Sequence, residues 1–170
     1  VASLQAGGTI YVCGNGGSAA EAQHAAGELV GRFLCERPAL RCVALTTDTS
    51  VLTAVANDYE FSRIFARQAE ALVREGDVLW GLSTSGNSPN VLAAADVARR
   101  RGAKVLGMTG RNGAKLAELG YSIVTGGYGG TSAEPEGERS VRDGCPAGIS
   151  GAGSSRNPGA GTAGIVRRPA

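Results

Sequence analysis

A cluster of hydroxyl side chains after an apolar run is the first feature of the sequence that suggests chemistry. The run 78–82 is followed within six positions by Ser83, Thr84, Ser85 and Ser88. An apolar run of this length predicts a buried strand, and Ser88 before Pro89 predicts a helix start. Hydroxyls and free backbone N–H groups would then gather at the positive end of a helix dipole, where a phosphate or another anion binds. An ordinary strand-to-helix turn with a good cap is the alternative.

A second turn of the same design lies nearer the start of the chain. The apolar run 9–13 is followed by small and polar residues, namely Gly14, Asn15, Gly16, Gly17 and Ser18. Ser18 with Glu21 three residues later predicts a capping box for a helix over 19–34. Glycines at such a turn let the backbone approach a ligand closely. Neither turn has the spacing of a dinucleotide or nucleoside-triphosphate motif, so those ligands are disfavoured.

His24 and Glu28 are four residues apart on the predicted helix 19–34, and they are therefore neighbours on one face. One interpretation is a general base beside a second polar or metal-binding group. The other is an ordinary surface pair. Two side chains could supply two metal ligands, whereas a zinc site needs three or four.

The elements that would position these residues alternate regularly along the chain. Apolar patterning and turn residues predict strands at 9–13, 41–45, 78–82, 104–109 and 121–124. They predict helices at 19–34, 51–56, 60–74, 89–101 and 114–119. This alternation predicts an α/β fold, a three-layer doubly wound parallel sheet with ligands at the carboxyl ends of its strands. Both small-residue turns follow strands, so they can meet in one crevice, which favours the anion site.

Composition limits the classes of function. The chain has 170 residues, enough for one domain, and a formal net charge of +2, too small to indicate a nucleic-acid or membrane surface. No run is long and apolar enough to span a membrane, and residues 1–5 do not resemble a signal region, so a cytoplasmic protein is expected. The four cysteines have no C-x-x-C spacing, so free thiols are expected.

The composition changes sharply after Val124. Residues 125–170 are rich in Gly, Ser, Ala and Pro, and their few large apolar residues follow neither period 2 nor period 3.6. Such a segment buries too little apolar surface to offset the entropy lost on ordering. We expect a domain over 1–124 and an irregular tail over 125–170, which is either disordered or the product of a shifted reading frame.

The motifs together resemble the phosphoheptose isomerase family, within the sugar-isomerase (SIS) domain superfamily. The resemblance covers about residues 5–124 and is carried by 13–18, 23–24, 28–33, 36–38, 57–58, 75–79 and 83–88. It implies an aldose–ketose isomerase that converts sedoheptulose 7-phosphate to D-glycero-D-manno-heptose 7-phosphate, for bacterial heptose and lipopolysaccharide core synthesis. It also implies a homotetramer whose active sites are shared between subunits.

The resemblance assigns expected roles by position. The phosphate would be held by Ser83, Thr84, Ser85 and Ser88. The sugar site would be lined by Asn15, Gly16, Gly17, Ser18, Asn57 and Asp58. Glu28 would contact the substrate as the general base, and His24 would act beside it. His24 and Glu28 would also supply part of a Zn²⁺ site.

One departure from the family lies in the tail. Family members continue after the last strand with a helix that carries a glutamine and a second histidine, which serve as metal ligands and as the acid partner. Here no glutamine follows Gln68, and His24 is the only histidine. The family's N-terminal helices are also missing. The sequence therefore predicts weak binding of sugar phosphate and poor or absent isomerisation.

Two alternatives remain beside an isomerase. One is a non-catalytic SIS-domain protein that binds or senses a sugar phosphate, such as the relative that associates with the replication initiator. Glu28 and Ser85 disfavour it, because that relative is expected to lack the helical carboxylate and the intact hydroxyl motif. The other is a damaged gene product without activity.

Overall fold

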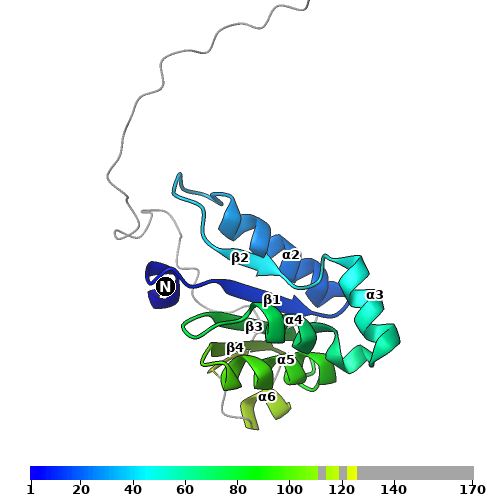
Figure 1. Cartoon of the computed structure of the whole chain (residues 1–170). Helices are drawn as coiled ribbons and strands as arrows, with labels where there is room; N and C mark the ends of the chain where they lie inside the picture. The colour runs from blue at the N-terminus through cyan, green and yellow to red at the C-terminus, as the bar shows by residue number, and fades with distance from the viewer. Residues whose placement is uncertain (111–113, 119–121, 126–170) are drawn as a thin grey trace, which may run out of the picture.

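The computed structural model describes residues 1–110, 114–118 and 122–125. Within them, five parallel strands form one sheet in the order β2-β1-β3-β4-β5 (Figure 1). Their bounds are Ile10–Gly14 for β1, Cys42–Ala44 for β2, Val78–Ser83 for β3, Lys104–Thr109 for β4 and Ser122–Thr125 for β5. The predicted parallel sheet is confirmed. The expected tail lies outside the described residues from 126 onward.

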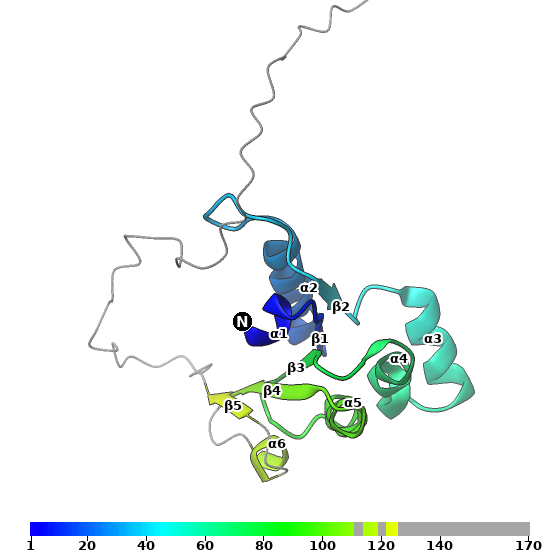
Figure 2. The ribbon, with the colours of Figure 1, turned by 60° about the vertical axis from the view of Figure 1, so that its left-hand side comes forward.

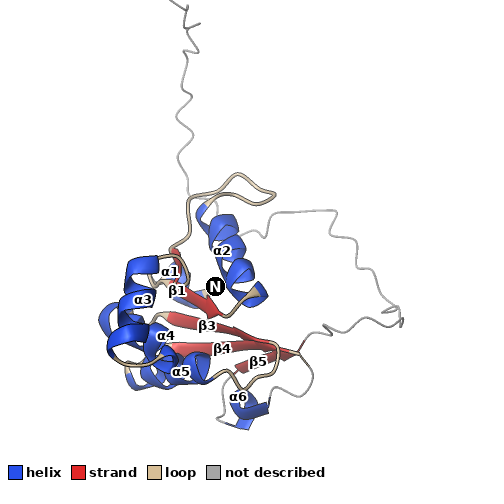
Figure 3. Cartoon of the chain, turned by 90° about the vertical axis from the view of Figure 1, so that its right-hand side faces the viewer, coloured by secondary structure: helices blue, strands red, loops and turns tan. Residues whose placement is uncertain are grey.

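Helices cover both faces of the sheet, which confirms the three layers. The helices are α1 (Ala2–Gln5), α2 (Gly17–Val30), α3 (Thr49–Asp58), a single 3₁₀ turn η1 (Phe61–Arg63), α4 (Ile64–Leu72), α5 (Pro89–Arg100) and α6 (Ala114–Glu118). Helix α2 packs on β1, β2 and β3 from one side, whereas α3, α4 and α5 lie on the other side (Figures 2 and 3). No helix among the described residues is both long and apolar enough to cross a membrane.

Each face of the sheet has its own apolar core. The larger core joins β1 and β3 to α4, α5 and α6 through side chains such as Leu79, Phe65, Val91 and Leu116, all at most 2% exposed. The smaller core lies under α2 and is built around Val12, Ala22 and Leu82, with Trp80 packed against it. Burial of this apolar surface fixes the strands in register and so fixes where their carboxyl ends lie.

The boundaries of α2 differ from the prediction. The helix begins at Gly17 with Gly16 as its N-cap, so the predicted capping role of Ser18 is wrong. The reason is that the Ser18 N–H already donates to the Asn15 carbonyl, at 2.9 Å, within the first helical turn. Gly16 has φ of +54°, a conformation that glycine adopts readily.

The helix also ends at Val30 instead of residue 34, because its last carbonyls find another partner. The Arg37 guanidinium donates to the Glu28 carbonyl at 2.8 Å and to the Leu29 carbonyl at 3.0 Å. These bonds satisfy carbonyl groups that a helix end leaves without an intrahelical donor.

The strand order creates a topological switch point between β1 and β3. From β1 the chain crosses to β2 on one side, and then to β3 on the other side of β1. The connections leaving β1 and β3 therefore run to opposite faces of the sheet, into α2 and α5 respectively. Ligands of open parallel sheets bind at the carboxyl ends of strands at such a point.

Candidate functional site

A crevice of about 290 Å³ opens at this switch point, where β1, β3 and β4 end. It is lined by Asn15, Gly17, Ser18, Glu21, Leu82, Ser83, Thr84, Met108, Thr109 and Gly110. The structure thus brings the two small-residue turns of the sequence together in one crevice.

The turn after β3 forms one wall and is braced by its own polar groups. The Ser83 hydroxyl, in a residue only 3% exposed, lies 2.9 Å from the Ser88 hydroxyl. The Ser85 hydroxyl accepts a bond from the Asn87 N–H at 3.2 Å. The Gly86 N–H donates to the Ser83 carbonyl at 2.9 Å, which closes a tight turn. The hydroxyls are therefore held in a fixed loop before any ligand arrives.

Ser88 precedes Pro89 at the start of α5, as the sequence predicted. Its side chain makes no capping bond to the helix. Because that hydroxyl bonds Ser83 instead, it caps no backbone N–H group of the first turn. The Val91 N–H donates to the Asn90 Oδ1 and the Leu92 N–H donates to the Ser88 carbonyl, both at 3.0 Å, so an anion at this end would be held by the hydroxyls and the helix dipole.

The turn after β1 forms the opposite wall, and a glycine lets it come close. A Cβ atom at Gly14 would lie 2.8 Å from the Ser18 Cβ and 3.0 Å from the Leu82 carbonyl oxygen. The contact with Ser18 is shorter than real Cβ atoms show, and the contact with Leu82 is tighter than most. Gly14 is therefore required for β1 to run into α2 while β3 ends beside it.

A pair of asparagines joins the two walls. The Asn15 Nδ2 donates to the Asn90 Oδ1 at 2.9 Å, and the Asn90 Nδ2 donates back to the Asn15 Oδ1 at 2.7 Å. The Asn90 Oδ1 also accepts the Val91 N–H at 3.0 Å, and Asn90 is 1% exposed. The Asn90 carboxamide is thus held between Asn15 and the first turn of α5.

The polar groups of the crevice suit an anion held by neutral donors. Glu21 is the one charged residue among those that line it. Hydroxyls, backbone N–H groups and the α5 dipole would therefore supply the attraction for a phosphate, without arginine or lysine from these residues.

The predicted base and metal ligands lie elsewhere on α2. His24 and Glu28 are adjacent, with 3.7 Å between His24 Nε2 and Glu28 Oε1, and their side chains are 76% and 38% exposed. Neither lines the crevice. Across the described ranges, no group of three or more His, Cys, Asp or Glu residues could hold a metal ion.

Asn57 and Asp58 also lie apart from the crevice lining. They form the last turn of α3, where the Asn57 Nδ2 donates to the Asp58 Oδ1 at 2.9 Å, and both residues are exposed. Gly16, Ser85 and Ser88 belong to the two turns but do not line the crevice. The structure therefore gathers five of the predicted site residues directly: Asn15, Gly17, Ser18, Ser83 and Thr84.

Sequence reasoning missed two polar residues at this site. Thr109 ends β4, beside the end of β3, and its buried hydroxyl has no hydrogen-bond partner within the described part of the chain. Its position at the carboxyl end of a predicted strand was a usable signal. Asn90 gave a weaker signal, because a polar residue in a first helical turn is usually solvated.

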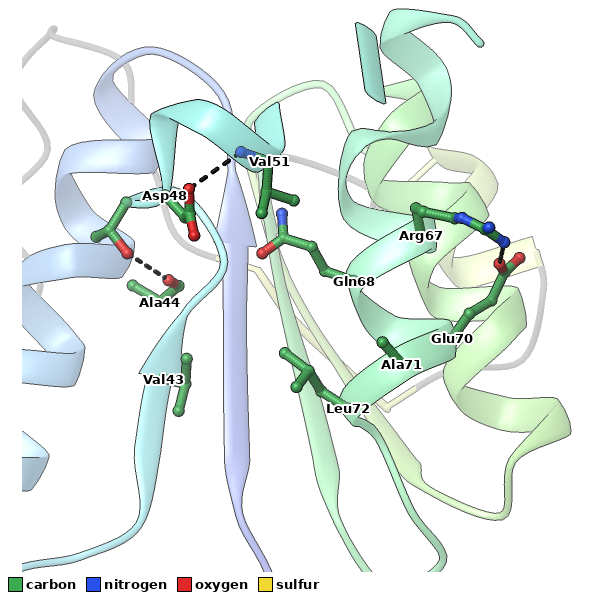
Figure 4. Close-up of a pocket in the computed structure, with 10 residues that line it drawn as sticks. Val43, Ala44, Asp48, Val51, Arg67, Gln68, Glu70, Ala71 and Leu72 are labelled. Atoms are coloured by element: carbon green, nitrogen blue, oxygen red, sulfur yellow. Dashed lines mark hydrogen bonds and ion pairs between the residues drawn. The ribbon is translucent and has the colours of Figure 1, made fainter. Parts of the chain in front are cut away.

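A larger cavity of about 660 Å³ lies between β2 and helices α3 and α4 (Figure 4). Its polar side chains already have partners. Asp48 accepts the Val51 N–H at 3.0 Å, Gln68 donates to the Leu45 carbonyl at 2.9 Å, and Arg67 pairs with Glu70 at 2.9 Å. With apolar groups such as Val43 and Leu72 between them, this cavity offers little to hold a charged substrate.

Comparison with known proteins agrees with the resemblance inferred from the motifs. A phosphoheptose isomerase from Desulfovibrio desulfuricans is 63% identical over 123 residues, which cover 72% of this chain and 59% of that relative. One from Rhodospirillum rubrum is 61% identical over 118 residues, which cover 69% of this chain and 63% of that relative. The chain thus spans about three fifths of the length of these curated relatives.

Solved structures agree as well. The phosphoheptose isomerase of Neisseria gonorrhoeae has a TM-score of 0.69 at 47% identity, covering 76% of this chain and 69% of that chain. The phosphoheptose isomerase of Francisella tularensis has a TM-score of 0.67 at 43% identity, covering 72% and 64% respectively. A family model for the SIS domain matches residues 1–110. The chain therefore belongs to the SIS domain family.

Proposed function

We propose that this chain is a sugar-phosphate isomerase that converts sedoheptulose 7-phosphate to D-glycero-D-manno-heptose 7-phosphate. The observation that carries the proposal is the braced hydroxyl turn at the switch point, in a chain 63% identical to a phosphoheptose isomerase. The phosphate would lie against Ser83, Thr84, Ser85 and Ser88, and the sugar would extend toward Asn15, Gly16, Gly17 and Ser18.

The reaction needs a base that moves a proton between the first two sugar carbons. A carboxylate takes the proton from C1 of the ketose, and its conjugate acid returns it to C2 of the resulting enediolate, while the proton of the O1 hydroxyl moves to O2. Glu28 is our candidate for this role, with His24 beside it.

The position of Glu28 supports a site shared between subunits. Glu28 lies seven positions after Glu21, the last α2 residue that lines the crevice, which corresponds to about 10 Å along a helix. Glu28 does not line the crevice of its own chain. We therefore propose a homotetramer in which Glu28 and His24, together with Asn57 and Asp58, serve the crevice of a neighbouring subunit.

Zn²⁺ remains a proposal from the resemblance. Among the described residues His24 and Glu28 supply two donors, and a zinc site requires three or four. These residues alone do not form a complete zinc site, so we derive no step of the reaction through the metal. Metal analysis of the purified protein tests this ligand count, because more than a trace of zinc per subunit would require donors beyond these two.

The proposed setting is bacterial heptose and lipopolysaccharide core synthesis in the cytoplasm. The alternative, a non-catalytic SIS-domain protein that binds or senses a sugar phosphate, is disfavoured by Glu28 and Ser85, which this chain retains.

The substitution Glu28→Gln separates the two functions. It removes the base but keeps the shape of the side chain, so we expect turnover of sedoheptulose 7-phosphate to fall by roughly 10²- to 10⁴-fold. Binding of the sugar phosphate, measured by calorimetry, should remain close to wild type. Turnover at the wild-type rate in this variant would exclude Glu28 as the base. Wild-type protein that binds the substrate without any turnover would support the non-catalytic alternative.

A further inference from the structure

We propose that Asn90 is a positioning residue of the crevice. It holds the Asn15 carboxamide and thereby fixes the turn after β1, which we call the sugar wall, relative to the turn after β3, which we call the phosphate wall. Asn90 itself is buried and lies behind the lining of the crevice. Its role is exerted through Asn15, which does line the crevice. The inference rests on the proposed function only where it is tested by kcat and KM.

The geometry of the pair is reciprocal. Each carboxamide donates one N–H and accepts one, at 2.9 and 2.7 Å, so the two amide planes face each other edge to edge. This arrangement fixes both the distance between the side chains and their rotation, because turning either amide over would place two donors or two acceptors together. A single hydrogen bond would leave that rotation free.

Asn90 is itself held firmly, so it can serve as the reference for Asn15. Its Oδ1 also accepts the Val91 N–H at 3.0 Å, and the residue stands in the first turn of α5 at 1% exposure. Val91 is fully buried in the larger core. The position of the Asn15 amide is thus set by α5, which is anchored in the core, and not by the glycine-rich turn that carries Asn15.

The pair leaves Asn15 able to bind substrate. One of the two Nδ2 hydrogens and one of the two Oδ1 lone pairs of Asn15 are used by Asn90, so one donor and one acceptor remain. A sugar hydroxyl needs this combination, because it both donates and accepts. Asn15 lines the same crevice as Ser83 and Thr84, so a fixed amide sets where the sugar lies relative to its phosphate.

A double-mutant cycle tests the proposal. We expect Asn90→Ala and Asn15→Ala each to lower kcat for sedoheptulose 7-phosphate by roughly 10- to 100-fold, with a smaller change in KM, because the phosphate wall remains. The double variant should match the poorer single variant within about twofold, since both changes remove the same interaction. Losses that multiply in the double variant would overturn the proposal.

A control on the same helix separates positioning from stability. Val97 lies in the core at 6% exposure, near the other end of α5. Val97→Ala should lower the melting temperature, as Asn90→Ala does, yet leave kcat and KM within about twofold of wild type. If Asn90→Ala lowers the melting temperature but keeps the wild-type kcat, Asn90 has a structural role only and the proposal is wrong.

A second measurement needs no substrate. It can therefore distinguish a failure of the proposed isomerase function from a failure of the positioning role of Asn90. If wild-type protein does not turn over sedoheptulose 7-phosphate, the proposed function fails, but the pair can still be read by NMR. In ligand-free protein the Asn15 side-chain amide should exchange slowly with solvent, and it should exchange rapidly in Asn90→Ala. Equal exchange in the two proteins would overturn the positioning role.

Discussion

At the scale of single residues, two buried cysteines give the protein a definite response to alkaline pH. Burial raises the pKa of the Cys13 thiol to about 12 and that of Cys42 to about 11. The ordinary pKa of a cysteine thiol is about 8.5, so in the unfolded protein these thiols ionise near that pH. The folded state therefore keeps these protons where the unfolded state loses them, and stability falls as pH rises above the unfolded pKa.

Cys13→Ala isolates this effect. We expect the free energy of unfolding of wild type, relative to Cys13→Ala, to fall by about 1.4 kcal/mol per pH unit above pH 8.5 and to be flat below it. Urea titrations at pH 7, 8.5 and 9.5 measure the difference, and other groups that titrate in this range cancel between the two proteins. A difference that stays constant across these pH values would contradict the burial of Cys13 as a neutral thiol.

The sequence predicted single residues well where their local chemistry is distinctive. Ser88 and Pro89 start α5 as expected, because serine and proline favour those positions. It did not predict the Asn15–Asn90 pair, since the partners are 75 residues apart and only the fold brings them together. Ser18 was misassigned because the flexible Gly16 allowed the helix to begin earlier.

At the scale of elements, the junction of β1 and α2 depends on Gly14. A Cβ there would meet Ser18 and the Leu82 carbonyl at 2.8 and 3.0 Å. We expect Gly14→Ala to destabilise the protein by about 1–3 kcal/mol, because the backbone of β1, β3 or α2 must shift to admit the methyl group. Urea unfolding monitored by circular dichroism measures the loss.

Gly17→Ala is the matched control for this substitution. A Cβ at Gly17 has no atom within 4 Å, and the residue begins α2. Alanine in a helix loses less conformational entropy than glycine, so we expect stability to be unchanged or higher by up to about 1 kcal/mol. Equal losses in the two alanine variants would show that crowding at Gly14 is not the cause.

The type and order of the elements were predictable because apolar runs and turn residues alternate clearly. All five strands were found in the described residues, with bounds within one or two positions of the prediction. The end of α2 was not predictable, because it depends on Arg37, which returns from a later loop to bond the Glu28 and Leu29 carbonyls.

At the scale of the whole molecule, the strand order explains why one crevice holds both turns. The order β2-β1-β3-β4-β5 puts β1 beside β3 and makes their carboxyl ends the switch point. The sequence predicted this edge of the sheet as the site, but it did not predict that Glu28 and His24 lie outside the crevice lining. Within the described residues, the turn proposed to bind the phosphate lies at the crevice, whereas Glu28, the proposed base, is not among the residues that line it.

The central claim is that this crevice holds the phosphate of a heptose that the protein isomerises, and Ser83 tests it most directly. The measurement is the conversion of sedoheptulose 7-phosphate to its aldose isomer by wild type and by Ser83→Ala, followed by NMR over a range of substrate concentrations. We predict slow but measurable conversion by wild type, which is the poor rather than the absent isomerisation among the outcomes expected from the sequence. The rate should be low because no glutamine or histidine follows Gln68, where the resemblance places metal ligands and the acid partner. Ser83→Ala removes the hydroxyl that bonds Ser88 and that we propose also bonds the phosphate. A hydrogen bond to a charged group contributes about 1.5 kcal/mol, so we expect KM to rise by roughly 10-fold. No conversion by wild type, or an unchanged KM in Ser83→Ala, would contradict it.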